Sequence, residues 1–324
     1  MALIFVTRRI PEIGLRYMRE GGHEVVVSEK DGVLTEAELK KALAARPYDG
    51  VVSLLTDTIT MDVLKGAPTV KVVANYAVGF NNIDVKGLQE AGIVVTNTPG
   101  VLTDTVAEFT AAFIMAVTKR IPEGDRFTRA GKYKGWAPEL LLGSDLAGKT
   151  LGIVGAGRIG SGVARRMAAG FGMQVKYYDI ARSEALEAEV ACEYYESLEE
   201  LLKVSDIVSI HVPLLPQTEH LINAERLALM KPTAYLVNTS RGPVIDEKAL
   251  VAALKKKIIR AAALDVFELE PKLATGLKSL DNVVLTPHIA SASEETRGKM
   301  SELVGYNINE FFLGHTPPNI VEVK

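Results

Sequence analysis

The chain has 324 residues, which is enough for about two domains of ordinary size. Hydrophobic residues make up 48% and charged residues 24%, the balance of a soluble globular protein, and the net charge of −3 excludes a broad basic surface for nucleic acid or an anionic membrane. The single cysteine, Cys192, excludes an internal disulfide and fits a reducing compartment, and we expect an inert packing thiol.

Short apolar runs alternate with helical patterns over the first hundred residues, which is the β-α-β rhythm of a parallel sheet covered by helices. Strands are predicted at residues 3–7, 24–28, 50–54, 70–75 and 93–96. Helices are predicted between them at residues 11–20, 35–46 and 60–64. Turn residues at 97–100 end this series.

After this break a helix is predicted to begin near residues 103–104 and to reach residue 117, and a second helical piece follows at 122–129. A second β-α-β series has short apolar strands, as buried parallel strands require, at residues 150–154, 174–178, 206–212, 234–238, 260–264 and 283–286. An amphipathic helix over residues 293–312 closes the chain. These elements predict two doubly wound α/β units, with the last helix returning to the first unit.

The N-terminal residues have no basic start, long apolar run or cleavage site of a signal peptide. The most apolar helical stretch, residues 109–117, is too short to span a bilayer. We therefore expect a cytoplasmic protein that does not enter a membrane.

A glycine-rich turn, Gly-x-Gly-x-x-Gly, follows the predicted strand 150–154 and opens a helix without proline. Gly155 permits the tight turn, Gly157 lets the backbone approach a pyrophosphate, and Gly160 lets helix and strand pack closely. The helix N-terminus offers free N–H groups and a partial positive charge to phosphates. This context favours a dinucleotide site over a glycine-rich turn without a ligand.

The next predicted strand ends in an acid, Asp179, which can accept hydrogen bonds from the hydroxyls of the adenosine ribose. Because a carboxylate repels a 2′-phosphate, Asp179 favours NAD(H) over NADP(H). NADP(H) stays open as an alternative, since Arg182 lies three residues later and could reach a 2′-phosphate.

Arg241, Glu270 and His288 each come a few residues after a predicted strand, where open α/β sheets place their ligands. These three residue types are what the reduction of a 2-oxo acid needs. A guanidinium grips the substrate carboxylate in a two-point fork, an imidazolium donates a proton to the carbonyl oxygen, and a carboxylate orients that imidazole and stabilises its charged form. The cofactor supplies the hydride.

Each of these residues also has an ordinary interpretation when taken alone. Arg241 could bridge surface groups, Glu270 could be solvated, and His288 could be a loop histidine. Only their joint placement favours catalysis. No pair of histidines has the spacing of metal ligands, so we predict no metal ion.

Taken together, these motifs resemble the D-isomer-specific 2-hydroxyacid dehydrogenases, and among them the glyoxylate and hydroxypyruvate reductases. The likeness covers essentially the whole chain, and its motifs lie at residues 75–84, 155–160, 211–214, 238–242, 265–271 and 286–291. The resemblance implies a flavodoxin-like catalytic domain made of residues 1–98 and 288–324. It implies a Rossmann nucleotide-binding domain made of residues 99–287, with the active site in a cleft between the two. Residues 272–276 do not match the family pattern closely.

The resemblance also implies a role for individual residues. Arg241, Glu270 and His288 would form the catalytic set, with His288 as the proton donor. The residues implied to contact the substrate are Leu54, Val78, Gly79 and Arg241, with Val78 and Gly79 acting through their backbone N–H groups. The residues implied to bind the dinucleotide are Thr103, Gly155, Gly157, Arg158, Ile159, Gly160, Asp179, Ile180, Val212, Pro213, Thr218, Thr239, Ser240, Asp265 and Ala290.

The implied reaction is the NADH-dependent reduction of glyoxylate, and of hydroxypyruvate, to the 2-hydroxy acid. A dehydrogenase for 3-phosphoglycerate or another D-2-hydroxy acid is the first alternative. A non-enzymatic dinucleotide sensor on the same scaffold is the second, and the presence of the whole catalytic set disfavours it. The resemblance further implies a homodimer through the nucleotide-binding domain, with the helix over residues 103–117 either at the contact or inside its own domain.

Overall fold

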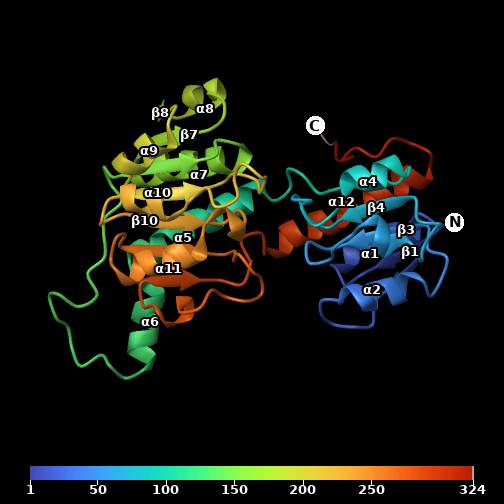
Figure 1. The fold of residues 1–324 in the computed structure, drawn as a ribbon, viewed down its shortest axis with the longest axis horizontal. Helices are drawn as coiled ribbons and strands as arrows, with labels where there is room; N and C mark the ends of the chain where they lie inside the picture. Colours follow the sequence, from blue (N-terminus) through green and yellow to red (C-terminus); the bar gives the residue numbers. More distant parts are fainter. Residues whose placement is uncertain (323–324) are drawn as a thin grey trace. The chain divides into compact units, whose positions relative to one another are not determined.

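The computed structural model describes residues 1–322, which divide into two compact units (Figure 1). Unit 1 comprises Met1–Leu102 and the described residues from Ala292 onward, and unit 2 comprises Thr103–Ser291. Along residues 1–322 we find no helix with the length and apolar character that a membrane span requires.

Within residues 1–322, unit 1 has one sheet of five parallel strands in the order β2-β1-β3-β4-β5. The strands are β1 (Leu3–Val6), β2 (Glu24–Val27), β3 (Gly50–Ser53), β4 (Val72–Asn75) and β5 (Val94–Thr96). The helices are α1 (Glu12–Glu20), α2 (Glu36–Leu43), α3 (Met61–Leu64), α4 (Val85–Glu90) and α12 (Glu294–Phe312). The strands β3 and β4 are buried along their whole length and consist of glycine, alanine and valine up to a final polar residue, Ser53 or Asn75.

Helix α12 belongs to unit 1 because it packs against α1 at very close range. Gly14 of α1 lies so near α12 that an added Cβ would stand 2.0 Å from the carbonyl oxygen of Ser301. The Ser301 hydroxyl also accepts a hydrogen bond from the Gly14 N–H at 3.2 Å and donates to the Pro11 carbonyl at 2.6 Å. The last described helix therefore completes the core that the first hundred residues begin.

Unit 2 has, within the described chain, one sheet of seven parallel strands in the order β12-β11-β10-β9-β6-β7-β8. The strands are β6 (Thr150–Val154), β7 (Gln174–Tyr178), β8 (Cys192–Tyr194), β9 (Ile207–Ile210), β10 (Tyr235–Asn238), β11 (Ala261–Leu264) and β12 (Val283–Leu285). The helices are α5 (Thr103–Thr118), α6 (Ile121–Arg129), α7 (Arg158–Phe171), α8 (Glu184–Glu189), α9 (Leu198–Val204), α10 (Ala224–Leu229) and α11 (Glu247–Lys255).

The predicted fold class, two doubly wound parallel-sheet α/β units, is confirmed. The strand predicted over residues 206–212 was too long, because the chain leaves the sheet after Ile210 to pack against the glycine-rich turn. The strand β8 was not predicted, since its sequence Cys-Glu-Tyr contains no apolar run. Helix α5 buries Phe113, Ile114 and Val117 in the core of unit 2, which supports the interpretation of this segment as a helix inside its own domain.

Candidate active site

The turn between β6 and α7 has the backbone geometry that its glycines predict. Gly155 has a φ of 97°, in the left-handed region, and an added Cβ would stand 2.8 Å from the carbonyl carbon of His211. At Gly160 an added Cβ would stand 2.0 Å from the Gly155 carbonyl oxygen. Gly157 is exposed and has no atom within 4 Å of its Cβ position. The turn is therefore tightly packed on its inner side and open at Gly157.

The N-terminus of α7 is free to receive an anion. Gly157 is its N-cap, so no side chain caps the helix, and the first turn contains no acidic residue. A helix of this length, 14 residues, carries unsatisfied N–H groups and a partial positive charge at this end. The open turn and the uncapped helix together fit the pyrophosphate of a dinucleotide.

Asp179 follows β7 and is tied to the same turn. Its carboxylate accepts hydrogen bonds from the backbone N–H of Ala156 and of Ile180, each at 2.7 Å. Arg182, the residue that left NADP(H) open, donates to both carboxylate oxygens of Glu187 at 2.7–3.0 Å. A 2′-phosphate would compete with Glu187 for Arg182 and would face the charge of Asp179, so the local charges favour NAD(H).

The other residues predicted to contact the dinucleotide lie mostly after the carboxyl ends of β6, β7, β9, β10, β11 and β12, and Thr103 opens α5. Thr218 donates to the Pro213 carbonyl at 2.6 Å and shapes the loop after β9. The Thr239 hydroxyl lies 2.9 Å from that of Thr110, and Ser240 donates to Asn238 at 2.8 Å. Ile180 is almost fully exposed. Their contacts with a cofactor stay a prediction.

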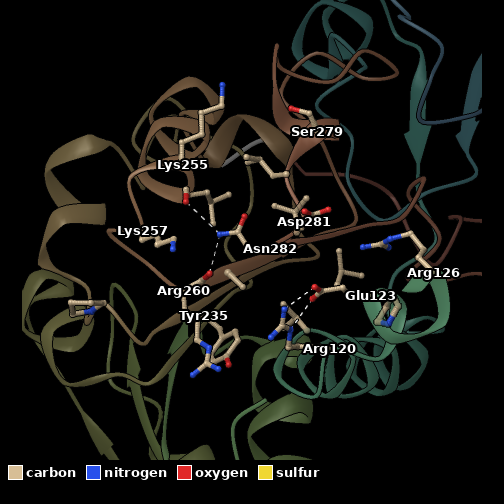
Figure 2. A pocket seen from close by; sticks show the side chains of 18 residues that line it. Arg120, Glu123, Arg126, Tyr235, Lys255, Lys257, Arg260, Ser279, Asp281 and Asn282 are labelled. Carbon is tan, nitrogen blue, oxygen red and sulfur yellow. Dashed lines mark hydrogen bonds and ion pairs between the residues drawn. The ribbon is translucent and has the colours of Figure 1, made fainter. Parts of the chain in front are cut away.

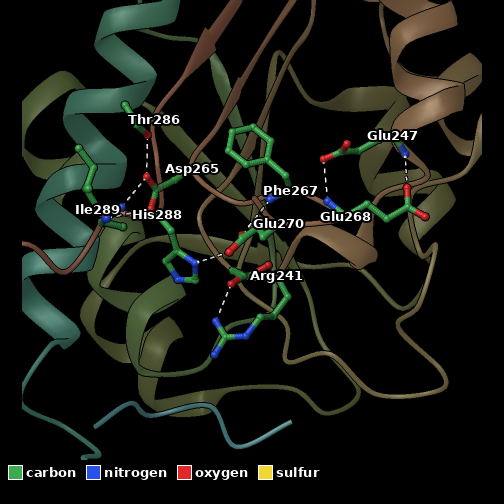
Figure 3. Close-up of polar contacts among 11 residues, drawn as sticks. Arg241, Glu247, Asp265, Phe267, Glu268, Glu270, Thr286, His288 and Ile289 are labelled. Carbon is green, nitrogen blue, oxygen red and sulfur yellow. Dashed lines mark hydrogen bonds and ion pairs between the residues drawn. The ribbon is translucent and has the colours of Figure 1, made fainter. Parts of the chain in front are cut away.

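Arg241, Glu270 and His288 follow the three neighbouring strands β10, β11 and β12 (Figure 3). The His288 Nδ1 lies 3.0 Å from the Glu270 Oε2, and the other Glu270 oxygen accepts from the Phe267 N–H at 3.0 Å. Arg241 donates to the Ser240 carbonyl at 2.7 Å. The sheet thus brings the predicted histidine and carboxylate into direct contact, and the arginine lies just after the adjoining strand β10.

The charges of this group act on one another. Burial acts to raise the pKa of the Glu270 carboxyl. The opposite effect prevails, and the pKa lies below its ordinary value, because Glu270 accepts hydrogen bonds from His288 and the Phe267 N–H and lies near the charges of His288 and Arg241. Burial lowers the pKa of the Arg241 guanidinium, and the charge of Glu270 opposes this. Glu270 is therefore ionised at neutral pH and can accept the His288 Nδ1–H bond.

His288 has a φ of 54°, in the left-handed region that side chains with a Cβ rarely adopt. Asp265, which is fully buried, holds this conformation in place. Its backbone carbonyl accepts from the His288 N–H at 2.8 Å, and its carboxylate accepts from Thr286, Ile289 and Ala290 at 2.6–2.8 Å. Both carboxylate oxygens of Asp265 are thus engaged by the segment that carries His288, a role that the sequence did not indicate.

In unit 1, Leu54 stands on the loop directly after β3. Its N–H donates to the buried Asp57 carboxylate at 2.8 Å, and its carbonyl accepts from the Asn82 amide at 3.1 Å. Thr7 also donates to Asp57. Burial raises the pKa of the Asp57 carboxyl, although the Thr7 and Leu54 hydrogen bonds work against this. The loop that would contact the substrate is therefore held by side chains from three segments of unit 1.

Val78 and Gly79 lie on the loop after the neighbouring strand β4. The carbonyl of Val78 accepts from Asn97 at 2.8 Å, and that of Gly79 accepts from Asn75 at 2.9 Å. Among the described residues, the N–H groups of Val78 and Gly79 have no acceptor. The loop is fixed through its carbonyls, which leaves two donors for an anionic group such as a carboxylate.

A hollow of about 660 Å³ lies where β10, β11 and β12 begin (Figure 2). Arg241, Glu270 and His288 instead follow the ends of these strands. Its charged lining residues are Arg120, Glu123, Arg126, Lys255, Lys257, Arg260 and Asp281. Arg120 donates to both oxygens of Glu123 at 2.7 Å. The hollow contains none of the predicted site residues.

Residues 1–322 contain no group of three or more histidine, cysteine or acidic side chains that could hold a metal ion.

Comparison with known proteins gives a consistent result. The family model described as "D-isomer specific 2-hydroxyacid dehydrogenase, NAD binding domain" matches residues 111–290. A glyoxylate reductase from Korarchaeum cryptofilum is 52% identical over 98% of this chain and 95% of its own length, and one from Thermococcus litoralis is 47% identical over 98% and 96%.

Solved structures agree with these sequence relatives. A protein from Thermus thermophilus superimposes with a TM-score of 0.92 at 43% identity, covering 99% of this chain and 100% of its own. An NADPH-dependent glyoxylate/hydroxypyruvate reductase from Sinorhizobium meliloti, solved with NADP and malonate, superimposes with a TM-score of 0.85 at 33% identity, over 99% and 96%.

Proposed function

Since the chain belongs to the D-isomer-specific 2-hydroxyacid dehydrogenase family, we propose that it reduces glyoxylate, and also hydroxypyruvate, to the 2-hydroxy acid. The observation that carries this proposal is the contact between His288 and Glu270 beside Arg241, on the sheet that also holds the glycine-rich turn. Its relatives from Korarchaeum and Thermococcus are named glyoxylate reductases, and the Sinorhizobium structure is a glyoxylate/hydroxypyruvate reductase.

His288 supplies the proton in this proposal, and Glu270 orients it. Because the Nδ1 atom of His288 is bound to Glu270, its Nε2 atom is the one left to donate to the carbonyl oxygen of the substrate. The ionised Glu270 stabilises the imidazolium and fixes which nitrogen faces the substrate.

Arg241 and the loop of Val78 and Gly79 bind the substrate carboxylate. The guanidinium offers two parallel donors to a carboxylate, and the two free N–H groups offer more. Leu54 then contacts the small apolar part of the substrate. This assignment makes unit 1 the substrate domain and unit 2 the nucleotide-binding domain.

A nicotinamide dinucleotide supplies the hydride when bound, and Gly157 with the first turn of α7 would hold its pyrophosphate. We propose NADH as the preferred form, because Asp179 lies beside the turn and Arg182 is paired with Glu187. NADPH remains the alternative, as the Sinorhizobium structure with NADP illustrates for a relative.

We also propose that the chain forms a homodimer through unit 2 and works in the cytoplasm. The support for the dimer is the exposure of large apolar side chains along α6 and the segment after it, Ile121, Trp136 and Leu142. Light scattering tests this, since a dimer has twice the 35.0 kDa mass of one chain. A mass of 35.0 kDa in solution would contradict it.

A steady-state panel tests the proposed activity. The purified protein is mixed with NADH or NADPH and with glyoxylate, hydroxypyruvate, pyruvate or phosphohydroxypyruvate, and the loss of absorbance at the nicotinamide band is followed. We expect the highest kcat/KM for glyoxylate with NADH. A higher value for phosphohydroxypyruvate would favour the phosphoglycerate alternative, and no turnover with any 2-oxo acid would leave only the sensor.

A further inference from the structure

Glu247 is a buried carboxylate that the proposed reaction does not use directly. It is the first residue of α11, and only 3% of its surface is exposed. Burying an ionisable group is unfavourable unless it has hydrogen-bond partners. One of its partners is the Glu268 N–H, which donates at 2.8 Å (Figure 3). The other is the Ala274 N–H, which donates at 3.3 Å.

These two donors stand at the two ends of the segment that carries Glu270. Between them the chain makes a turn, closed by the Lys272 N–H and the Leu269 carbonyl at 2.8 Å. The contact is reciprocal at one end, because the Glu247 N–H donates to the Glu268 side chain at 3.1 Å. Glu247 therefore holds both ends of residues 268–274 against the N-terminus of α11.

The segment that leads into α11 also contacts the same loop. Gly242 lies so close to it that an added Cβ would stand 1.9 Å from the carbonyl carbon of Phe267 and 2.4 Å from the Glu268 nitrogen. Arg241 immediately precedes this contact, and Glu247 follows it by five residues. One short stretch of chain thus fixes the place of Arg241 and the place of the loop with Glu270.

The charges around Glu247 oppose its ionised form, and its two backbone hydrogen bonds favour that form. Burial and the charges of Glu268 and Glu270 raise the pKa of the Glu247 carboxyl, while its two backbone donors oppose this. The His220 Nε2 lies 2.9 Å from the Glu268 Oε1, and this hydrogen bond raises the pKa of the His220 imidazole. An apolar side chain at position 247 would avoid the repulsion but would leave two N–H groups without their acceptor.

We propose that Glu247 is a positioning residue for the reaction: it clamps residues 268–274 so that Glu270 stays in contact with His288 and beside Arg241. The inference rests on the proposed function, because it assigns Glu247 to the same catalytic set. Since orientation errors of about 1 Å can reduce a rate by about a hundredfold, loosening this loop should lower turnover without changing the cofactor site.

The test compares Glu247→Ala and Glu247→Gln with matched variants of Asp206. Asp206 is a suitable control because its carboxylate also accepts a backbone N–H, from Thr150 at 2.9 Å, but at the edge of the sheet where the strands begin. We expect Glu247→Ala to lower kcat for glyoxylate by about tenfold or more, with the NADH Kd unchanged, and Glu247→Gln to lower kcat less, because its amide keeps one acceptor. Asp206→Ala and Asp206→Asn should keep kcat within about twofold.

A double-mutant cycle with Glu270→Gln separates positioning from general destabilisation. If Glu247 acts through Glu270, Glu247→Ala should reduce kcat much less in the Glu270→Gln background than in the wild type. An equal reduction in both backgrounds would overturn the proposal, as would a kcat for Glu247→Ala within about twofold of the wild type.

Amide hydrogen exchange provides a readout that does not depend on turnover. We expect the Glu268 and Ala274 amides to exchange faster in Glu247→Ala and to stay unchanged in Asp206→Ala. Unchanged exchange at both amides would show that Glu247 does not hold the loop. If these amides exchange faster in Glu247→Ala but the wild type does not reduce glyoxylate, Glu247 does hold the loop and the proposed function is wrong.

Discussion

We assign to Asp179 the discrimination between the two nicotinamide dinucleotides. Its carboxylate accepts from the Ala156 N–H of the glycine-rich turn, so its charge lies beside the predicted binding position of the cofactor. Arg182, which lies three residues after Asp179 and could favour a phosphate, is held by Glu187. Both observations act in the same direction, toward NADH.

Replacing Asp179 by Ser should therefore shift the cofactor preference. Removing the negative charge takes away the repulsion of a 2′-phosphate, and we expect the ratio of kcat/KM for NADPH to that for NADH to rise about tenfold or more. Adding Glu187→Gln, which frees Arg182, should raise the ratio again. The measurement is the pair of kcat/KM values at saturating glyoxylate, and an unchanged ratio in both variants would reject this role.

At the scale of residues, the sequence indicates the proposed reacting groups more clearly than the groups that hold them in place. The placement of His288, Glu270 and Arg241 after neighbouring strands could be predicted, because each follows a short strand and has a chemically distinctive side chain. Their catalytic roles stay a proposal. The clamps formed by Asp265 and Glu247 could not be predicted, because their backbone partners lie 21 to 27 residues away along the chain. Nothing in a local pattern shows which buried carboxylate meets which loop.

At the scale of elements, α2 shows how a helix start depends on charge. Thr35 caps the helix by accepting from the Glu38 N–H at 3.3 Å, and Glu38 accepts from the Thr35 N–H at 2.8 Å, which makes a capping box. Lys30 donates to both oxygens of Glu38 at 2.6–2.8 Å. Hydrogen bonds from Lys30 and Thr35 lower the pKa of the Glu38 carboxyl to about 2.

This lowered pKa gives a pH-dependent prediction for Glu38→Gln. A carboxyl whose pKa is lower in the folded chain stabilises the fold above its ordinary pKa of 4.5, and this contribution is lost as the pH falls toward 2. We expect the wild type to need more urea than Glu38→Gln at pH 7, by a small margin because the side chain is exposed. The margin should shrink between pH 4.5 and pH 3. A margin that grows on acidification would contradict this assignment.

The first and last residues of a strand can be predicted where its pattern of apolar residues is strong. The strands β6 and β7 begin and end where they were predicted. β6 is mostly apolar and buried, and in β7 the buried Val175 and Tyr177 alternate with more exposed residues. At the edge of the sheet the apolar pattern does not reveal the strand. The edge strand β8 pairs with β7 alone, and its alternation of half-buried Cys192 and Tyr194 with exposed Glu193 covers only three residues, which is too short a pattern to recognise.

At the scale of the whole molecule, the order of elements along the chain matters most. Unit 2 is inserted between β5 and α12, and α12 completes unit 1 by packing on α1. The close contact at Gly14 is what permits this packing, because any side chain there meets the backbone at Ser301. The sequence indicated a returning helix, but the requirement for glycine at position 14 depends on a residue 287 positions later.

Two glycine substitutions test this packing. Gly14→Ala places a Cβ against the backbone of α12 and should destabilise the fold by about 1–3 kcal/mol. Gly298→Ala is the matched control, because Gly298 lies on α12 with nothing within 4 Å of its Cβ position. That control should stabilise the fold by up to about 1 kcal/mol through helix propensity. Urea unfolding measures both values, and a Gly14→Ala variant as stable as the wild type would show that α1 and α12 pack more loosely.

The most direct test of the central claim is the turnover of His288→Ala with glyoxylate and NADH, measured together with the NADH Kd. If His288 donates the proton, kcat should fall by about a hundredfold or more while the Kd stays within about twofold of the wild type. A loss of kcat below about tenfold, or an equal loss of NADH binding, would contradict the assignment of His288 as the proton donor.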